Sequence, residues 1–216
     1  MTEANSSLEN TLILASSSPR RDQLLSEAGV RFEVLVPSGP EAEREDGEDC
    51  ASFARRAAEE KARQVALASP GRLVLGADTI VVLDREVLGK PAGPEEASRM
   101  LRSLAGRAHQ VITGVAFARA GSHGEVELEG AAICSEVRFR QLSDQEIEAY
   151  VATGEPLDKA GAYGIQGLGG ALVESYTGSY TNIVGLPMEY VLESLGRDLS
   201  AGKVGQDITP TGHRQD

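Results

Sequence analysis

Short runs of apolar residues alternate with amphipathic segments along most of this chain. Apolar runs rich in β-branched residues and bounded by turn residues are typical of strands. They predict strands over residues 11–15, 32–36, 72–83, 87–88, 108–119 and 126–140. Asp84-Arg85 and the segment Gly121–Gly124 are short enough to join neighbouring strands as hairpins.

Helix start and stop signals lie between these strands. Ser18 precedes Pro19, an order that favours a helix beginning at the proline, and Gly29 is positioned to end that helix. Ser143 and Glu146 form the S-x-x-E pattern of a capping box, which predicts a helix through Ala152. Further helices are predicted over residues 50–68, 94–104 and 185–195.

This order of elements indicates an α/β fold. Because strands and helices do not alternate strictly, a mixed, twisted sheet is expected in place of a uniformly parallel one. The chain of 216 residues is long enough for one large domain or two small lobes. We expect one domain over residues 11–199, flanked by flexible tails at residues 1–10 and 200–216, where apolar periodicity is lacking.

Charge and composition limit the kinds of partner and the cell compartment that we expect for this protein. The formal net charge is −12, which opposes binding to nucleic acid polymers and to anionic membranes. No apolar run approaches the ~20 residues of a membrane helix, and the polar N-terminus does not resemble a signal peptide. The two cysteines, Cys50 and Cys134, lack a metal-ligand spacing and favour free thiols in a reducing compartment. We therefore expect a cytoplasmic protein.

Cationic residues gather at the predicted start of the first helix. Arg20 and Arg21 follow Ser16, Ser17, Ser18 and Pro19, so two guanidinium groups lie in the first helical turn. Cations are unfavourable there unless an anion is bound by the free N–H groups of the helix end. The alternative is a surface helix with two solvated arginines.

Asp78 interrupts an apolar strand. It lies in Gly76-Ala77-Asp78-Thr79, inside the apolar run from Leu73 to Val82. A carboxylate in such a run is costly unless it is paired, binds metal or lies at a strand end. A metal ligand or a general base is the functional interpretation, and an aspartate that bonds its own backbone is the alternative.

Three further signals are weaker. Lys90, in Leu88-Gly89-Lys90-Pro91, could bind phosphate, although a lone loop lysine is more often solvated. Lys61 lies on a helix face that carries many other charges. The segment Gly154–Gly167 is rich in glycine and contains Gln166, whose amide could read the edge of a base. That segment could equally be a connection between lobes.

The motifs of several enzyme classes are missing. The sequence has no G-x-x-x-x-G-K-[ST] loop, no G-x-S-x-G elbow and no H-E-x-x-H pair, and its three histidines are scattered. The residues thus indicate a protein that binds a phosphorylated small molecule, together with a divalent cation.

The same segments resemble the Maf family of nucleotide pyrophosphatases. The resemblance extends in order over roughly residues 11–196. Its most specific pieces are GADTIVVLDREVLGKP at 76–91, GEPLDKAGAYGIQGLGG at 154–170 and GSYTNIVGLP at 178–187, and LASSSPRRDQLL at 14–25 and EEKA at 59–62 also match.

The resemblance implies a fold, a reaction and a set of site residues. The expected fold has two lobes around a cleft, similar to inosine triphosphate pyrophosphatases, and often forms a homodimer. The expected reaction is hydrolysis between the α- and β-phosphates of a nucleoside triphosphate with Mg²⁺ or Mn²⁺. By position, the phosphates would be bound by Ser16, Arg20, Arg21, Lys61 and Lys90. Asp78 would be the base or a metal-linked carboxylate, and Glu41 would lie near the metal.

Three positions predict the base. Arg20, Thr79 and Gln166 match the Maf subgroup that is selective for dTTP and UTP, whereas a subgroup acting on 7-methyl-GTP has a bulky residue, a glutamine and a glutamate there. A neutral glutamine suits the imide edge of thymine or uracil, which mixes a donor with acceptors.

The sequence is also compatible with other functions. One is a non-catalytic nucleotide-binding regulator, because Maf proteins are associated with septum formation. Others are an enzyme for modified pyrimidine nucleotides such as 5-methyl-UTP, and a phosphohydrolase that releases orthophosphate.

Overall fold

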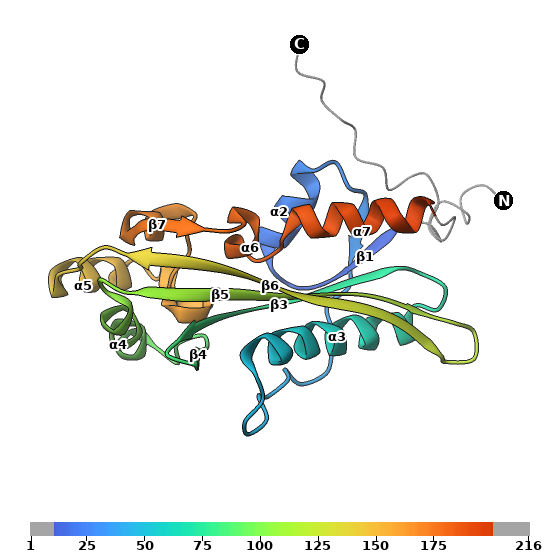
Figure 1. The fold of residues 1–216 in the computed structure, drawn as a ribbon, viewed down its shortest axis with the longest axis horizontal. Coiled ribbons are helices and arrows are strands. Elements are labelled where there is room, and N and C mark those ends of the chain that lie inside the picture. Colours follow the sequence, from blue (N-terminus) through green and yellow to red (C-terminus); the bar gives the residue numbers. More distant parts are fainter. Residues whose placement is uncertain (1–10, 201–216) are drawn as a thin grey trace, which may run out of the picture.

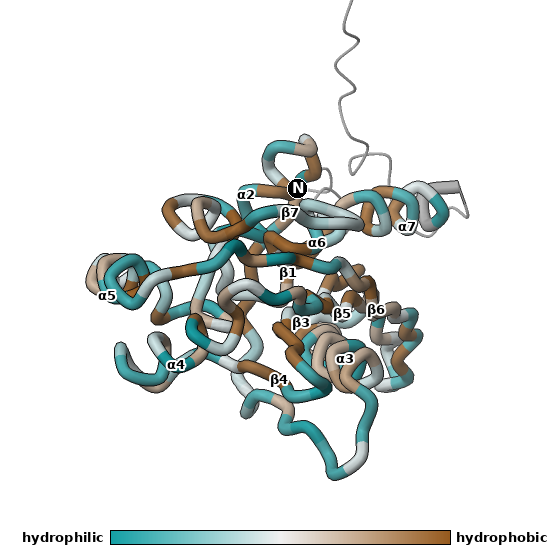
Figure 2. Tube along the Cα trace, turned by 60° about the vertical axis from the view of Figure 1, so that its left-hand side comes forward, coloured by the Kyte–Doolittle hydropathy of each residue, from teal (hydrophilic) through white to brown (hydrophobic). Residues whose placement is uncertain are grey.

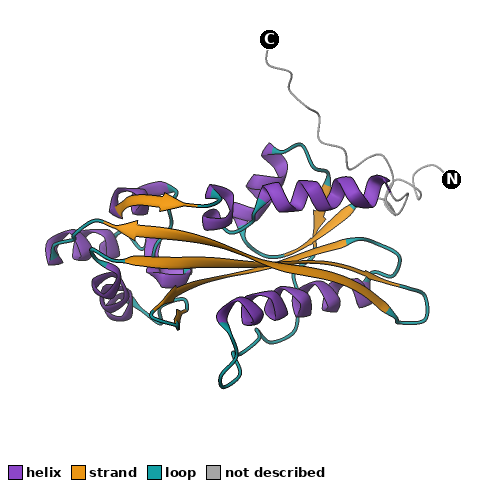
Figure 3. Cartoon of the chain, in the orientation of Figure 1, coloured by secondary structure: helices purple, strands orange, loops and turns teal. Residues whose placement is uncertain are grey.

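The computed structural model describes residues 11–200, which form one long, twisted sheet with helices on both faces (Figures 1 and 3). The strands are β1 Leu12–Ala15, β2 Phe32–Val34, β3 Val74–Leu83, β4 Glu86–Leu88, β5 Ala108–Ala120, β6 Val126–Phe139 and β7 Val173–Thr177. The two predicted tails fall outside the described residues, apart from residue 200, and the domain limits stay a prediction.

The sheet has the order β2-β1-β3-β5-β6-β7, and β4 pairs with β3 beside this path. β1 runs parallel to both β2 and β3, and all the other pairs are antiparallel. The predicted mixed α/β sheet is therefore confirmed. β7 was not predicted, because its sequence Val-Glu-Ser-Tyr-Thr carries little apolar signal.

The helices mostly begin and end where the sequence predicts. They are α2 Pro19–Glu27, α3 Cys50–Ala68, α4 Pro94–Leu104, α5 Asp144–Ala152, α6 Tyr180–Val184 and α7 Met188–Ser200, and three short 3₁₀ turns, η1 to η3, lie between Glu155 and Leu172. Ser18 is the N-cap of α2, and Ser143 and Glu146 complete the predicted capping box of α5.

The helix predicted over residues 185–195 is present as α7, but it begins at Met188, three residues later than predicted, and the short helix α6 before it was not predicted. The structure has α6 before that range and α7 from Met188, with a break between them. Gly185 ends α6 with a φ of 127°, a backbone conformation that favours glycine. Pro187 lacks the N–H that a continuous helix would use.

Alternation along β3 separates the core into layers. Val74, Ile80 and Val82 point to the face covered by α3, where they join two apolar clusters. Leu75 and Ala77 point to the opposite face and pack with α2 and α7, and further along that face Val81 and Leu83 pack with α4 and α5. Figure 2 shows hydrophobic stretches gathered in the central strands. The face opposite α3 thus carries two apolar clusters, one around Leu75 and Ala77 and one around Val81 and Leu83.

Contact between α3 and β5 requires a glycine. A Cβ placed on Gly114 would lie 1.9 Å from the Ala54 carbonyl oxygen, a backbone atom that cannot move independently. We expect Gly114→Ala to lower the free energy of unfolding by about 2–3 kcal/mol, measured by urea denaturation. Gly196→Ala is the control, because a Cβ added at that exposed α7 position would meet nothing within 4 Å. It should instead raise stability, by up to ~1 kcal/mol. Equal effects of the two substitutions would contradict close packing at Gly114.

Candidate active site

The site lies where β3 loses its neighbours on one side. β1 pairs with β3 only as far as Gly76, and β4 pairs with β3 only from Val81 onward. Within the described sheet, residues 77–80 are therefore paired on one side alone, with β5. The gap opens into a cavity of about 580 Å³, a size typical of small-molecule sites.

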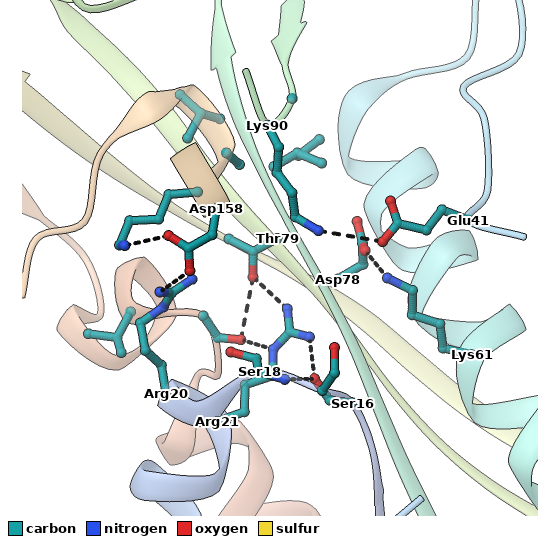
Figure 4. A pocket seen from close by; sticks show the side chains of 18 of the residues that line it. Ser16, Ser18, Arg20, Arg21, Glu41, Lys61, Asp78, Thr79, Lys90 and Asp158 are labelled. Atoms are coloured by element: carbon teal, nitrogen blue, oxygen red, sulfur yellow. Dashed lines mark hydrogen bonds and ion pairs between the residues drawn. The ribbon is translucent and has the colours of Figure 1, made fainter. Parts of the chain in front are cut away.

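Polar side chains replace the apolar core on both faces of β3 at this gap. Asp78 points to the α3 face and Thr79 points to the opposite face, between the two apolar clusters described above. Figure 4 shows these two side chains with the cationic residues around them. All the residues that the sequence singled out for the site line this cavity: Ser16, Arg20, Arg21, Glu41, Lys61, Asp78, Thr79, Lys90 and Gln166.

The start of α2 faces the cavity without a side-chain cap. Ser18 is the N-cap, but its side chain accepts no hydrogen bond from the helix. The Ser18 N–H is bonded instead to the Ser16 hydroxyl, at 3.2 Å. Free N–H groups at a helix start attract anions, so this end of the cavity suits a phosphate.

Arg21 is buried and bonded mainly to the protein. Its Nε donates to the Gly185 carbonyl at 2.8 Å. Its Nη1 donates to Ser16 Oγ and to the Ala77 carbonyl, both at 2.9 Å, and its Nη2 donates to Thr79 Oγ1 at 3.1 Å. A guanidinium has five N–H donors, so these four bonds leave one. Burial lowers the pKa of Arg21 below its ordinary value, and the charge of Asp78 opposes this shift.

Arg20, the neighbouring arginine, is more accessible. Its Nη1 lies 3.6 Å from the Asp158 carboxylate, which reaches across the cavity from η1 and is also bonded to Lys159 at 2.6 Å (Figure 4). The pair is partly solvated, so its contribution to stability is small. Asp158 and Lys159 were not predicted as site residues, although the charged pair inside a glycine-rich segment was a usable signal.

Two carboxylate–lysine pairs form the opposite wall. Lys61 Nζ on α3 lies 2.5 Å from Asp78 Oδ1, and both side chains are about four-fifths buried. Lys90 Nζ, after β4, lies 3.6 Å from Glu41 Oε1, in a more exposed position. Figure 4 shows both pairs on the same side of the cavity. The described residues contain no cluster of three or more histidine, cysteine, aspartate or glutamate side chains suited to a metal.

Thr79 and Gln166 differ in whether their side chains already form hydrogen bonds within the protein. Thr79 Oγ1 lies 3.0 Å from Thr113 Oγ1 and already accepts from Arg21. The half-buried Gln166 side chain lines the cavity, and its amide makes no hydrogen bond with the described residues. Of these two residues, Gln166 therefore has the greater capacity to bind a ligand.

His109 packs beneath the cavity lining and gives a pH-dependent prediction. Its Nε2 lies 2.7 Å from the Tyr163 hydroxyl, and burial lowers the pKa of His109 to about 4 from its ordinary 6.5. Between these values the unfolded chain binds a proton that the folded protein does not. The free energy of unfolding is therefore not reduced by His109 above pH 6.5, and it falls by about 3 kcal/mol as the pH drops from 6.5 to 4.

Urea denaturation at several pH values measures this contribution. We expect His109→Gln to flatten the pH dependence between 6.5 and 4, whereas His123→Gln, at an exposed position, should leave it unchanged. A wild-type slope that survives in His109→Gln would assign the acid sensitivity to other groups.

Several known proteins resemble this chain in sequence. The family model described as Maf-like protein matches residues 11–197. A dTTP/UTP pyrophosphatase from Symbiobacterium thermophilum is 52% identical over 184 residues, which are 85% of this chain and 92% of that protein. A dTTP/UTP pyrophosphatase from Escherichia coli O157:H7 is 49% identical over 86% of this chain and 91% of its own length. Among solved structures, a HAM1 protein from Coxiella burnetii aligns with a TM-score of 0.42 at 17% identity, over 60% of this chain and 72% of that one.

The family match spans nearly all the described residues and includes every candidate site residue. The relatives match at about half of all positions over most of their own length. On this evidence the chain belongs to the Maf family.

Proposed function

We propose that this protein hydrolyses dTTP and UTP, and related modified pyrimidine nucleotides, to the nucleoside monophosphate and pyrophosphate. The observation that carries the proposal is the convergence of cations, a partly buried carboxylate and an unbonded amide on one cavity. The name shared by relatives that are about 50% identical, dTTP/UTP pyrophosphatase, supports the same reaction.

A triphosphate needs charge neutralisation more than covalent chemistry. Arg20, Lys61 and Lys90 come from three separate segments around the cavity, and Ser16 lies beside the uncapped start of α2. Arg21 has one N–H that is not engaged by the protein, and we propose that it contacts phosphate through this group. These groups would hold the phosphates and stabilise the charge of the leaving pyrophosphate.

We propose that Asp78 is the general base. Its carboxylate lines the cavity and is paired with Lys61 at 2.5 Å through Oδ1, in reach of a nucleotide and a water molecule bound there. Only Oδ1 is engaged by Lys61, so Oδ2 is available to a water molecule in the cavity. Bound triphosphate would compete for Lys61 and Lys90, which would leave Asp78 and Glu41 partly released.

Asp78 and Glu41 fit a divalent cation that arrives with the nucleotide. Mg²⁺ is commonly held by one or two carboxylates together with substrate phosphates and water, and these two carboxylates lie on one side of the cavity (Figure 4). Such a cation, Mg²⁺ or Mn²⁺, would neutralise phosphate charge and orient the attacking water.

Base selection is proposed to depend on Gln166, Arg20 and Thr79. Gln166 offers both an acceptor and donors to the imide edge of uracil or thymine. Because the Thr79 hydroxyl is already bonded to Arg21 and Thr113, we propose that Thr79 contributes by fixing the shape of the cavity floor.

Three further proposals concern the cell compartment, the oligomeric state and nucleic acid binding. We propose that the protein is cytoplasmic and forms a homodimer. We also propose that it does not bind nucleic acid polymers, because its net charge of −12 opposes that binding. Within the described residues, none of the helices has the length and apolar character to span a membrane.

Comparing kcat/KM for dTTP, UTP and 7-methyl-GTP, with Mg²⁺, with Mn²⁺ and with EDTA, tests the base and the cation together. We expect metal-dependent turnover that favours dTTP and UTP. A higher kcat/KM for 7-methyl-GTP would refute pyrimidine preference. Tight dTTP binding by folded protein without any turnover would favour the regulator alternative.

A further inference from the structure

The backbone around Gln166 is held by a carboxylate outside the set of proposed site residues. Glu155, at the start of η1, receives the Gly169 N–H on Oε1 at 3.0 Å and the Leu168 N–H on Oε2 at 3.1 Å. Its Oε1 also accepts the Tyr150 hydroxyl at 2.9 Å. The loop is thereby tied to α5 just after Gln166.

Tyr150 holds the other side of the same loop. Its hydroxyl oxygen accepts the Gly164 N–H at 3.4 Å, two residues before Gln166. The tyrosine belongs to the apolar cluster of α4 and α5 and is 6% exposed. Burial raises the pKa of Tyr150, so its hydroxyl stays protonated and able to donate to Glu155. A rigid core residue therefore connects the two anchoring points.

Close packing around Gly169 restricts the conformation of the loop. A Cβ on Gly169 would lie 2.3 Å from the Gly164 carbonyl oxygen and 2.6 Å from the Tyr150 hydroxyl. The pKa of Glu155 also lies below its ordinary value: burial opposes this shift, but the N–H groups of Gly169 and Leu168 outweigh burial. The carboxylate is thus charged and engaged at neutral pH, as an anchor must be.

We propose that Tyr150 and Glu155 are positioning residues for base recognition, because they fix the backbone on both sides of Gln166 and so fix the place of its amide in the cavity. The inference rests on the proposed function, in which Gln166 reads the base. It adds that selectivity depends on a hydroxyl and a carboxylate that bond to the loop backbone. Loss of one bond should let the Gln166 amide move, which weakens a directional contact and leaves the phosphate contacts intact.

UTP and CTP separate these effects, because they differ only at the base edge. For Tyr150→Phe we expect KM for UTP to rise about 5-fold and kcat to stay within about 2-fold. This is the loss expected when one hydrogen bond between Gln166 and the base is lost. KM for CTP should change little, so the UTP/CTP ratio of kcat/KM should fall about 5-fold. Tyr176→Phe is the matched control, since it removes a hydroxyl from an exposed tyrosine on β7, and should leave the ratio unchanged.

Combination with Gln166→Ala distinguishes positioning from general damage. If Tyr150 acts through Gln166, Tyr150→Phe should not lower the UTP/CTP ratio further in a Gln166→Ala background. Glu155→Gln should lower the ratio in the wild type and likewise add nothing after Gln166→Ala. An unchanged ratio in Tyr150→Phe, with equal losses for both nucleotides, would overturn the proposal, and so would an equal fall in both backgrounds.

Calorimetry measures the binding of non-hydrolysable UTP and CTP analogues to the same variants. It separates the proposal about Tyr150 and Glu155 from the proposed reaction. A wild type that prefers the UTP analogue by an amount that depends on Tyr150 supports the inference, even if turnover is absent and the proposed reaction is wrong. A wild type that hydrolyses UTP but shows no Tyr150-dependent preference refutes the inference alone.

Discussion

Replacing Asp78 by asparagine is expected to lower kcat for UTP by about 10²–10³-fold, within the range lost when a general base is removed. Asparagine has nearly the same shape, and its Oδ1 can still accept from Lys61, so the fold and the cation wall should persist. The dissociation constant for a non-hydrolysable UTP analogue should therefore change by less than about 3-fold. Steady-state kinetics and calorimetry measure the two quantities separately.

Asp84→Asn is the matched control for this substitution. Asp84 lies at the end of the same strand, in the turn before β4, and pairs with Arg107 at the surface. It should retain wild-type turnover. If Asp78→Asn reduced binding and turnover to the same degree, Asp78 would have a structural role and the base would have to be sought elsewhere.

Replacing Arg21 by alanine is expected to lower the free energy of unfolding by at least ~3 kcal/mol. The substitution deletes four hydrogen bonds from one buried guanidinium and leaves acceptors on Ser16, Ala77 and Gly185 without that donor. These acceptors belong to the loop after β1, the open edge of β3 and the α6–α7 break. Arg21 thus joins three segments around the cleft, and its loss should affect stability before it affects the choice of base.

Arg20→Ala provides the comparison, because it removes the same side chain one residue earlier on the same helix. Its partly solvated ion pair with Asp158 predicts a change below about 1 kcal/mol. Urea denaturation of both variants measures the difference. Similar stability losses at the two positions would contradict the distinction drawn between a buried connecting arginine and an accessible one.

Local signals were sufficient for most element boundaries. The helices Cys50–Ala68, Pro94–Leu104 and Asp144–Ala152 begin and end as predicted, because caps, prolines and apolar periodicity act within a few residues. The long antiparallel pair of β5 and β6 also follows from two apolar runs around a short glycine-bounded turn.

Contacts between segments that are far apart in the sequence could not be predicted from local patterns. The gap beside residues 77–80 arises because β1 ends at Ala15, opposite Gly76, and β4 ends at Leu88, opposite Val81. No local pattern says that both strands pair with the same edge of β3. The bonds of Arg21 to Ala77 and Gly185 span 56 and 164 positions in sequence. The sequence grouped the two arginines together, whereas the structure separates an accessible Arg20 from a buried Arg21.

Family resemblance identified the lining of the cavity better than its support. Every residue transferred by position, including the weakly signalled Lys61 and Lys90, lines one cavity. Glu155 and Tyr150 were not singled out, because a glutamate before a proline and a tyrosine in an amphipathic helix are ordinary in a sequence. Only their bonds to the loop around Gln166 distinguish them.

The products of UTP hydrolysis distinguish cleavage between the α- and β-phosphates from cleavage at the terminal phosphate. Purified protein should be incubated with UTP and Mg²⁺, and nucleotides and phosphates should be separated and quantified. We expect UMP and pyrophosphate in equal amounts, and we expect orthophosphate to appear only after a pyrophosphatase is added. UDP with orthophosphate would show cleavage at the terminal phosphate and would contradict the proposed reaction.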